Sequence, residues 1–252
     1  MKSIDGGAKW LRRARPLMGT LVEVGVRDSG TGSEELIRSA FNILCEIQTC
    51  LSRFEAGSDI SRFHASPAGA SLMVRSHTAE VLAAARSLYD ASDGVFDVTL
   101  RSSPGGWRCD GTRLDKLRQE VRLDLGGIAK GYAVDIAVGT LIAAGCEAGW
   151  VNAGGDLRVF GHFRLPVSLR DEATGGVRPF ATLSDGAFAT SHFDRHSRSR
   201  AANAPEGVPV RAHASVAAPL CMWADALTKL VAISGDASHA LLSRYDAQAW
   251  LH

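Results

Sequence analysis

The segment Leu123–Asp135, LDLGGIAKGYAVD, is the most informative stretch in this chain of 252 residues. It begins in a short predicted strand, Val121–Leu125, and continues into a predicted helix over residues 129–144. Gly126-Gly127 lets the chain turn tightly between the two elements. Glycines in such a turn let backbone N–H groups approach a phosphate, whose negative charge the N-terminus of a helix favours. The segment therefore predicts either an anion-binding site or an ordinary tight turn.

Two charged side chains accompany this turn. Asp124, at the end of the strand, is a candidate acceptor for a ribose or a base, and Lys130 is a candidate partner for a phosphate. The alternative is that both are ordinary surface charges. The segment matches neither the G-x-G-x-x-G dinucleotide fingerprint nor a Walker phosphate-binding loop, so both of these nucleotide motifs are excluded.

Strands and helices follow one another irregularly on both sides of this segment. The predicted strands are 18–27, 121–125, 150–152, 157–160, 164–169, 180–190, 213–217 and 247–251, and the predicted helices begin at Ser33 or span 77–91, 129–144, 222–233 and 238–245. A loop is expected over residues 55–71, and residues 194–211 are polar without a predicted element. Strict βαβ alternation is missing, so the sequence predicts an α+β fold with mixed sheets packed against helices.

Composition and charge exclude several classes of protein. Apolar residues make up 46% of the chain and charged residues 22%, as in ordinary globular proteins. The formal net charge of +1 argues against a non-specific nucleic-acid binder. The chain has no run of about 18 apolar residues, so no membrane-spanning helix is predicted. The five cysteines are odd in number and form no C-x-x-C pair, which disfavours both a disulfide framework and a structural zinc site.

The first residues bear on the compartment. Residues 1–15 carry charges but no apolar stretch of the kind found in a signal peptide, and no lipoprotein cysteine precedes the predicted elements. As written, the chain is expected to be cytoplasmic. It is expected to be periplasmic if the sequence is that of a trimmed mature form.

Three further segments contain candidate functional residues. Asp93–Leu100, DGVFDVTL, is a predicted turn that leads into a strand, in which Phe96 faces the core and Asp97 faces away from it. Asp97 is a turn residue or a ligand group. Asn152–Asp156, NAGGD, is a second glycine turn after a strand, and it carries the same two interpretations.

The third segment, Ala224–Leu230, lies within a predicted helix. Asp225 and Thr228 share a helical face, which would present a carboxylate and a hydroxyl to a hard cation such as Mg²⁺. Lys229 lies four residues after Asp225, so the alternative is an ordinary i,i+4 ion pair. In the metal interpretation, the Lys229 ammonium would occupy the place of the cation or repel it.

The histidines form no metal-ligand pattern, and no G-x-S-x-G nucleophile motif is present. His192 and His196 are four residues apart, but the segment around them is not convincingly helical. The sequence therefore offers no candidate for a zinc centre or a serine hydrolase.

In their order along the chain, these segments resemble the ApbE-type flavin transferases, the FAD:protein FMN transferase family. The resemblance covers most of the chain from residue 15 to about residue 235, and it is strongest at DLGGIAKGYAVD. The matching stretches are RPLMGT (15–20), LSRFEAGSDISRF (51–63), GVFDVT (94–99), DLGGIAKGYAVD (124–135), NAGGDLRVFG (152–161), ATS (189–191) and ADAL (224–227). The resemblance implies a short tail, residues 1–14, and one domain, residues 15–252, built as two closely packed α/β lobes of the ApbE or T-fold type.

The resemblance also implies a reaction. Family members cleave the pyrophosphate of FAD with the help of Mg²⁺ and transfer FMN to a Thr or Ser hydroxyl of an acceptor protein, with release of AMP. The implied FAD site consists of Met18, Phe54, Val95, Phe96, Asp97, Asp124 and Lys130. The implied metal ligands are the Gly127 carbonyl, Asp225 and Thr228, and the implied catalytic residues are Asp225 and His192.

The sequence departs from the family pattern at four places. Phe54 stands where the family usually has Tyr, and Lys229 stands where it usually has the Thr that follows the metal-binding Asp. The usual H-x-I-D-P-x-T-G stretch corresponds to residues 200–210, where both the His and the Asp are absent. His192, which follows Ser191 in place of the usual Gly, is the candidate replacement for that His.

Three functional hypotheses remain open on the sequence. The first is an active flavin transferase with an acceptor protein as its partner. The second is a module that binds FAD without transfer, which the loss of the transfer motif favours. The third is an FAD pyrophosphatase that uses water as the acceptor and produces free FMN and AMP.

Overall fold

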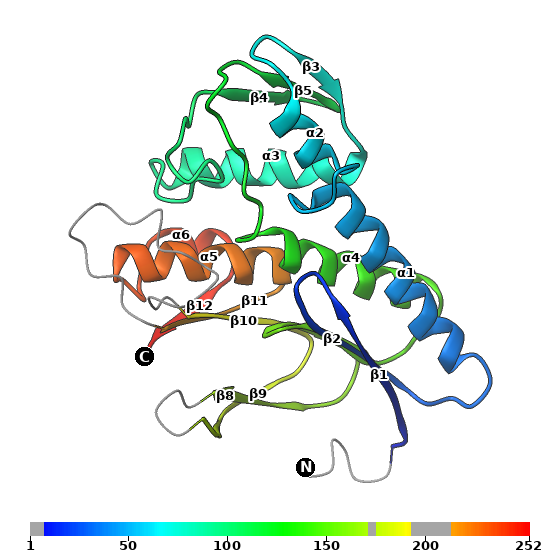
Figure 1. Cartoon of the computed structure of the whole chain (residues 1–252). Coiled ribbons are helices and arrows are strands. Elements are labelled where there is room, and N and C mark those ends of the chain that lie inside the picture. Colours follow the sequence, from blue (N-terminus) through cyan, green and yellow to red (C-terminus); the bar gives the residue numbers. More distant parts are fainter. Residues whose placement is uncertain (1–7, 171–174, 193–212) are drawn as a thin grey trace.

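The computed structural model describes residues 8–170, 175–192 and 213–252 and centres on a seven-stranded sheet (Figure 1). The strands, in their order across the sheet, are β1 (Trp10–Leu17), β2 (Thr20–Arg27), β6 (Gly149–Ala153), β7 (Asp156–Phe160), β10 (Gly186–His192), β11 (His213–Ala218) and β12 (Gln248–Leu251). The α+β class is confirmed. Every strand pair in the described part of the chain is antiparallel, so the sheets are more uniform than the mixed sheets expected.

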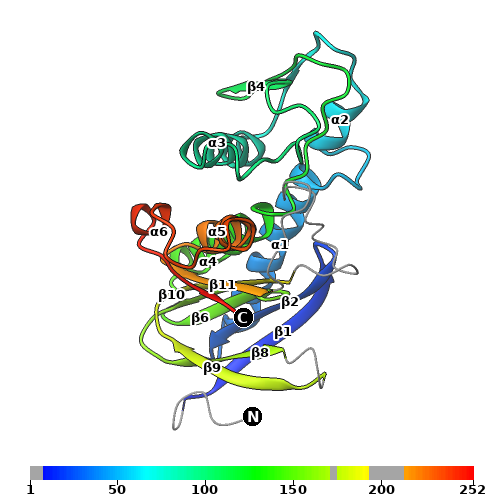
Figure 2. The same cartoon turned by 90° about the vertical axis from the view of Figure 1, so that its left-hand side faces the viewer.

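Different layers cover the two faces of this sheet (Figures 1 and 2). One face packs against α1 (Ser33–Leu51), α4 (Ala129–Ala143) and α5 (Cys221–Ser234), and the short α6 (Leu241–Arg244) lies beside α5. The other face packs against the hairpin of β8 (Leu165–Arg170) and β9 (Val177–Leu183). In β10, Ala187 and Ala189 belong to the helical core whereas Phe188 belongs to the hairpin core, as strand alternation requires.

A smaller lobe lies beyond the helical layer (Figure 1). It contains α2 (Asp59–Ala65), α3 (Ser76–Ala91) and a three-stranded sheet of β3 (Ser71–Met73), β5 (Arg113–Lys116) and β4 (Trp107–Asp110). The chain returns from this lobe to the helical layer through residues 117–128, so the segment Leu123–Asp135 connects the two parts. No helix of the described residues has the length and apolar character needed to cross a membrane.

Several predicted elements differ from those observed. The expected loop at 55–71 contains α2, and residues 121–125 form no strand, although Val121, Leu123 and Leu125 are buried as a strand would bury them. The predicted strand 180–190 is two strands joined by a turn in which Asp185 has a positive φ of 42°. β1 begins at Trp10, so the sheet includes part of the segment expected to be a tail.

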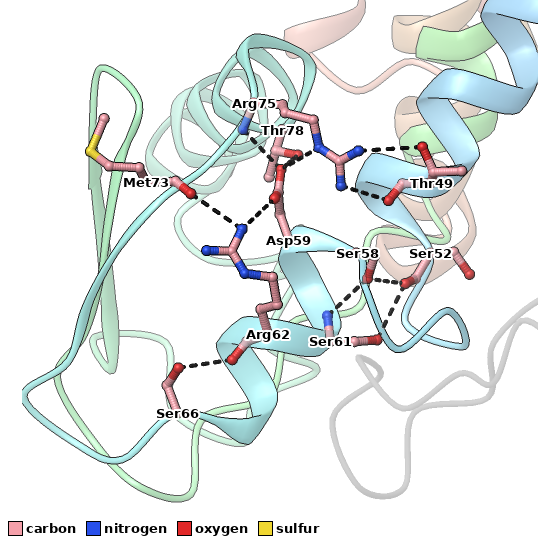
Figure 3. Close-up of polar contacts among 10 residues, drawn as sticks. All are labelled: Thr49, Ser52, Ser58, Asp59, Ser61, Arg62, Ser66, Met73, Arg75 and Thr78. Carbon is pink, nitrogen blue, oxygen red and sulfur yellow. Dashed lines mark hydrogen bonds and ion pairs between the residues drawn. The ribbon is translucent and has the colours of Figure 1, made fainter.

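Buried Asp59 joins the small lobe to the helical layer (Figure 3). Its carboxylate is 1% exposed and accepts hydrogen bonds from the Thr78 hydroxyl at 2.7 Å and the Arg75 backbone N–H at 2.9 Å. The Arg62 guanidinium pairs with the same carboxylate at 3.2 Å. Arg75 also donates to the Thr49 carbonyl at 2.8 Å. Asp59 therefore joins α2 to the start of α3, and Arg75 links both to the end of α1.

Ser58 stabilises the turn that carries Arg53 and Phe54. Its hydroxyl accepts from the Ser61 N–H at 3.0 Å, as an N-cap of α2, and donates to the Ser52 carbonyl (Figure 3). We expect Ser58→Ala to lower the free energy of unfolding by about 1 kcal/mol, because the cap and the turn closure are both lost. Urea denaturation would measure the change. The matched control is Ser66→Ala at the other end of α2, where an exposed hydroxyl bond should matter little; equal losses in both variants would contradict this role.

Candidate functional site

Four buried or half-buried charged side chains meet where α4, α5 and β7 come together. The Lys130 ammonium contacts the Asp156 carboxylate directly and lies 3.6 Å from Oδ2 of Asp225. The Lys229 ammonium pairs with Oδ1 of Asp225 and donates to the Asp225 backbone carbonyl at 3.0 Å. These residues form what we call the charge cluster. With all four groups ionised, its net charge is zero.

Burial and proximity shift the pKa values in this cluster in opposite directions. Burial and the neighbouring Asp225 carboxylate raise the pKa of Asp156. Burial would also raise the pKa of Asp225, but Lys130 and Lys229 outweigh it and hold that pKa below its ordinary value. For Lys130, burial favours the neutral form, yet Asp156 and Asp225 raise the pKa above its ordinary value. Asp225 and Lys130 are therefore held in their charged forms.

Lys229 extends along the glycine turn. A Cβ placed on Gly127 would lie 3.4 Å from Cε and 3.7 Å from Cγ of Lys229, so the lysine stem packs against the face of this glycine. Thr228 points elsewhere: its hydroxyl donates to the Asp225 carbonyl at 2.6 Å and lies 2.6 Å from the Ser191 hydroxyl on β10. Since Thr228 has one hydroxyl proton, Ser191 must donate to it.

The start of α5 is held by α4, which fixes the position of Asp225. Both oxygens of Asp135 accept backbone N–H groups, from Cys221 at 2.9 Å and Met222 at 2.8 Å. Arg158 from β7 pairs with Asp135 at 2.8 Å. The N–H groups of Cys221 and Met222 lie in the first turn of α5 and have no partner within that helix. A carboxylate at a helix N-terminus is also favourable, because it interacts with the positive end of the helix dipole. Asp135, the last residue of DLGGIAKGYAVD, is therefore a positioning residue for the charge cluster.

The structure brings three of the expected FAD-site segments near one another. Oδ2 of Asp124 lies 3.4 Å from Nε of Arg53, and the Arg53 guanidinium lies 4.4 Å from the centre of the Phe54 ring. The Asp124 N–H donates to the Val98 carbonyl at 2.7 Å, which joins the 94–99 segment to the same turn. The Phe54 ring is 81% exposed and offers a free stacking face.

The Asp97 carboxylate accepts hydrogen bonds from residues of its own loop. Asp97 is 3% exposed and accepts from the Thr99 N–H and hydroxyl, both at 2.8 Å, and from the Arg101 N–H at 3.0 Å. Phe96 is buried in the core and Val95 is half-buried against it. In the described structure, Asp97 and Phe96 therefore shape the loop beside Asp124 and present little of themselves to a ligand.

Met18 lies in the turn between β1 and β2, with a positive φ of 54° that is uncommon outside glycine. Its backbone N–H donates to Oε1 of Gln48 on α1 at 2.6 Å. A surface hollow is formed here by residues 16–21 and Gln48. The role of Met18 in binding FAD stays a prediction.

His192 does not join the charge cluster. It follows Ser191 on β10, and successive strand residues face opposite sides of a sheet. Ser191 faces α5 through Thr228, so His192 faces away from α5, and its Nδ1 lies 2.8 Å from Nδ1 of His213. The structure therefore separates the two expected catalytic residues, His192 and Asp225.

Sequence reasoning assigned no role to Asp156, Asp135 or Arg53. Asp156 is the last residue of NAGGD, and Asp135 is the last residue of DLGGIAKGYAVD. The acidic residue at the end of each glycine-rich motif could have indicated a role for both. Arg53 had no local signal, because its partner Asp124 is distant in sequence. Residues 200–210, where the sequence lacks the family's usual His and Asp, lie outside the described residues.

The sequence profile described as "ApbE family" matches residues 18–114 and 104–251. The chain belongs to the ApbE family. A solved structure, the apo form of the flavinyl transferase ApbE of Pseudomonas stutzeri, is similar to this chain with a TM-score of 0.78 at 24% identity, over 90% of this chain and 84% of that one. At this identity, the likeness shows the fold that the sequence resemblance implied.

Two curated relatives are named "FAD:protein FMN transferase". The one from Vibrio cholerae is 24% identical over 225 residues, which cover 73% of this chain and 66% of the relative. The one from Rhodobacter capsulatus is 38% identical over 94 residues, which cover 34% of this chain and 18% of the relative. This chain thus spans less than two thirds of the length of either relative.

The residues expected to bind Mg²⁺ do not fit that ion. Mg²⁺ requires oxygen ligands in octahedral geometry, yet both carboxylate oxygens of Asp225 face ammonium groups, and the Lys229 stem packs beside the Cα of Gly127. The Thr228 hydroxyl is committed to Ser191 and a backbone carbonyl. Across the described ranges, no group of three or more His, Cys, Asp or Glu side chains gathers to hold a metal.

Proposed function

We propose that this chain binds FAD and transfers FMN from it to a Thr or Ser hydroxyl of an acceptor protein, with release of AMP. The observation that carries the proposal is the match of residues 18–114 and 104–251 to the ApbE family, whose curated relatives bear the name FAD:protein FMN transferase. The Mg²⁺ that the resemblance implies is left out of the proposal, because the residues at Asp225 do not fit it.

In the proposed reaction, the acceptor oxygen forms a bond to the phosphorus of the FMN half of FAD. The bond between that phosphorus and the bridging oxygen breaks, and AMP leaves with the bridging oxygen. The acceptor hydroxyl gives its proton to water. Such a transfer depends on positioning and on neutralising the phosphate charge.

Several described residues suit these tasks. The Lys130 side chain is 29% exposed, against 10% for Lys229, so Lys130 is the more accessible lysine of the charge cluster and the candidate partner for a pyrophosphate. Its raised pKa keeps it positively charged. The exposed Phe54 ring, with Arg53 stacked on it, suits an aromatic ring system of FAD.

The test is intact-mass spectrometry of an acceptor domain that the Vibrio cholerae relative flavinylates, incubated with this chain and FAD. We expect the mass of the acceptor to increase by that of an FMN phosphoester, and the increase to be absent when FMN replaces FAD. The Vibrio cholerae relative is the positive control. Free FMN and AMP without an adduct would replace the proposal with an FAD pyrophosphatase. Intact bound FAD without turnover would replace it with a binding module.

A further inference from the structure

Lys229 occupies the position from which a cation would contact Asp225. Its ammonium pairs with Oδ1 of Asp225 and donates to the Asp225 carbonyl at 3.0 Å, while its stem lies along Gly127. The side chain is 10% exposed, so the ammonium is held inside the protein rather than in solvent. An i,i+4 pair on a helix surface is weak and exchangeable, whereas this pair is enclosed by α4 and α5.

The second oxygen of Asp225 is also in use. Oδ2 lies 3.6 Å from the Lys130 ammonium and accepts the Gly131 N–H at 3.3 Å. Lys130 in turn contacts Asp156, so each carboxylate of the charge cluster already has a cationic partner. A divalent ion at Asp225 would have to displace Lys229 and would then lie next to two positive charges. Like charges at such separations in a partly buried site repel strongly.

Removal of Lys229 would reverse this balance. With threonine in its place, the cluster would retain the carboxylates of Asp225 and Asp156 against the single ammonium of Lys130, and its net charge would be −1. A hydroxyl at position 229 would add a hard oxygen ligand beside Oδ1 of Asp225 and the Gly127 turn. Carboxylate and hydroxyl oxygens around an unfilled negative site suit a hard divalent cation.

We propose that the Lys229 ammonium is a built-in cation of this site, which takes the place of a divalent metal ion at Asp225. The chain therefore binds no Mg²⁺ or Mn²⁺ there, and it binds the pyrophosphate of FAD equally well with and without divalent ions. The second part rests on the proposed function; the first does not. Lys229 acts as a positioning residue, since it holds the Asp225 carboxylate in the absence of metal.

The first test measures Mn²⁺ binding to the full chain by electron paramagnetic resonance of the free ion, because Mn²⁺ shares the oxygen preference of Mg²⁺. We expect no binding to the wild-type chain up to about 1 mM, the weak end of protein divalent-cation sites. We expect Lys229→Thr to bind one Mn²⁺ about 10- to 100-fold more tightly than the wild type, a range typical of changes next to a metal site. Asp225→Asn in the Lys229→Thr background should abolish that gain.

Two results would overturn the proposal. The first is stoichiometric Mn²⁺ binding to the wild-type chain that is lost in Asp225→Asn. The second is the absence of any gain in Lys229→Thr while its circular dichroism matches that of the wild type. If Lys229→Thr fails to fold, Lys229→Gln keeps the length of the side chain and removes its charge, and it should show a gain in the same direction.

A separate titration distinguishes this proposal from the proposed function. Quenching of FAD fluorescence gives the Kd of the wild-type chain in EDTA and in Mg²⁺, and we expect the two values to agree. An FAD affinity that increases about tenfold or more with Mg²⁺, equivalent to about 1.4 kcal/mol, would overturn the metal-independent binding. Absence of FAD binding in both conditions would defeat the proposed function and the second part of this proposal, while the Mn²⁺ result would still decide the first part.

Discussion

Replacing Asp225 with alanine is expected to lower the free energy of unfolding by about 3–5 kcal/mol. Asp225 is fully buried, and its carboxylate is the partner of Lys229 and a second partner of Lys130. Its loss would leave the Lys229 ammonium, whose side chain is 10% exposed, without a carboxylate in a low-dielectric environment. The Gly131 N–H would also lose its acceptor. Chemical denaturation of the wild type and the variant would measure the change.

A double-mutant cycle separates the ion pair from the other contacts of Asp225. Lys229→Met removes the ammonium and keeps an apolar stem against Gly127. We expect the double variant with Asp225→Ala to lose about 1–3 kcal/mol less stability than the sum of the single variants, since the second change removes the unpaired charge created by the first. Asp236→Ala, which removes an exposed carboxylate from a surface turn, is the control and should cost much less. Equal losses for Asp225→Ala and Asp236→Ala would contradict the buried pair.

The sequence predicted the larger elements of the fold because their patterns are local. The helix after Gly126-Gly127 and the helix that contains Asp225 are both present, since apolar periodicity and glycine boundaries determine them within a few turns. The small elements were missed for the same reason. α2 has seven residues in a Ser- and Gly-rich segment, and Asp59 anchors it through hydrogen bonds to Arg75 and Thr78, which lie outside this helix. No local pattern contains that information.

The residues of the site were likewise predicted from the sequence only where their contacts are local. Lys229 was recognised from its spacing to Asp225, and the predicted i,i+4 pair is confirmed, but burial makes it an internal part of the charge cluster rather than a surface pair. Asp156 joins the cluster only because β7 lies beside α4. His192 follows Ser191 in β10, and neighbouring strand residues face opposite sides of the sheet, so His192 faces away from α5. The predicted strand ended at residue 190, however, and the contact between Ser191 and Thr228 that shows which side faces α5 comes from the structure.

The contact between α4 and α5 gives the second large expected effect. Gly131 on α4 faces the start of α5, where a Cβ would lie 2.3 Å from the Cys221 carbonyl oxygen and 2.7 Å from its carbonyl carbon. These are backbone atoms, and the N–H groups of Cys221 and Met222 are tied to Asp135 on the same α4. The start of α5 therefore cannot move aside without losing hydrogen bonds.

We expect Gly131→Ala to lower the free energy of unfolding by about 2–3 kcal/mol, because forced overpacking exceeds any gain in helix propensity. The matched control is Gly139→Ala on the same helix, where a Cβ would meet nothing within 4 Å. Alanine at that position should stabilise the chain by about 0.5–1 kcal/mol, the usual advantage over glycine in a helix. The two substitutions are chemically identical and lie on one helix, so opposite signs in urea denaturation isolate the α4–α5 contact. A gain in stability in both variants would show that α5 can move away from α4, and Asp225 would then not be held in place by this packing.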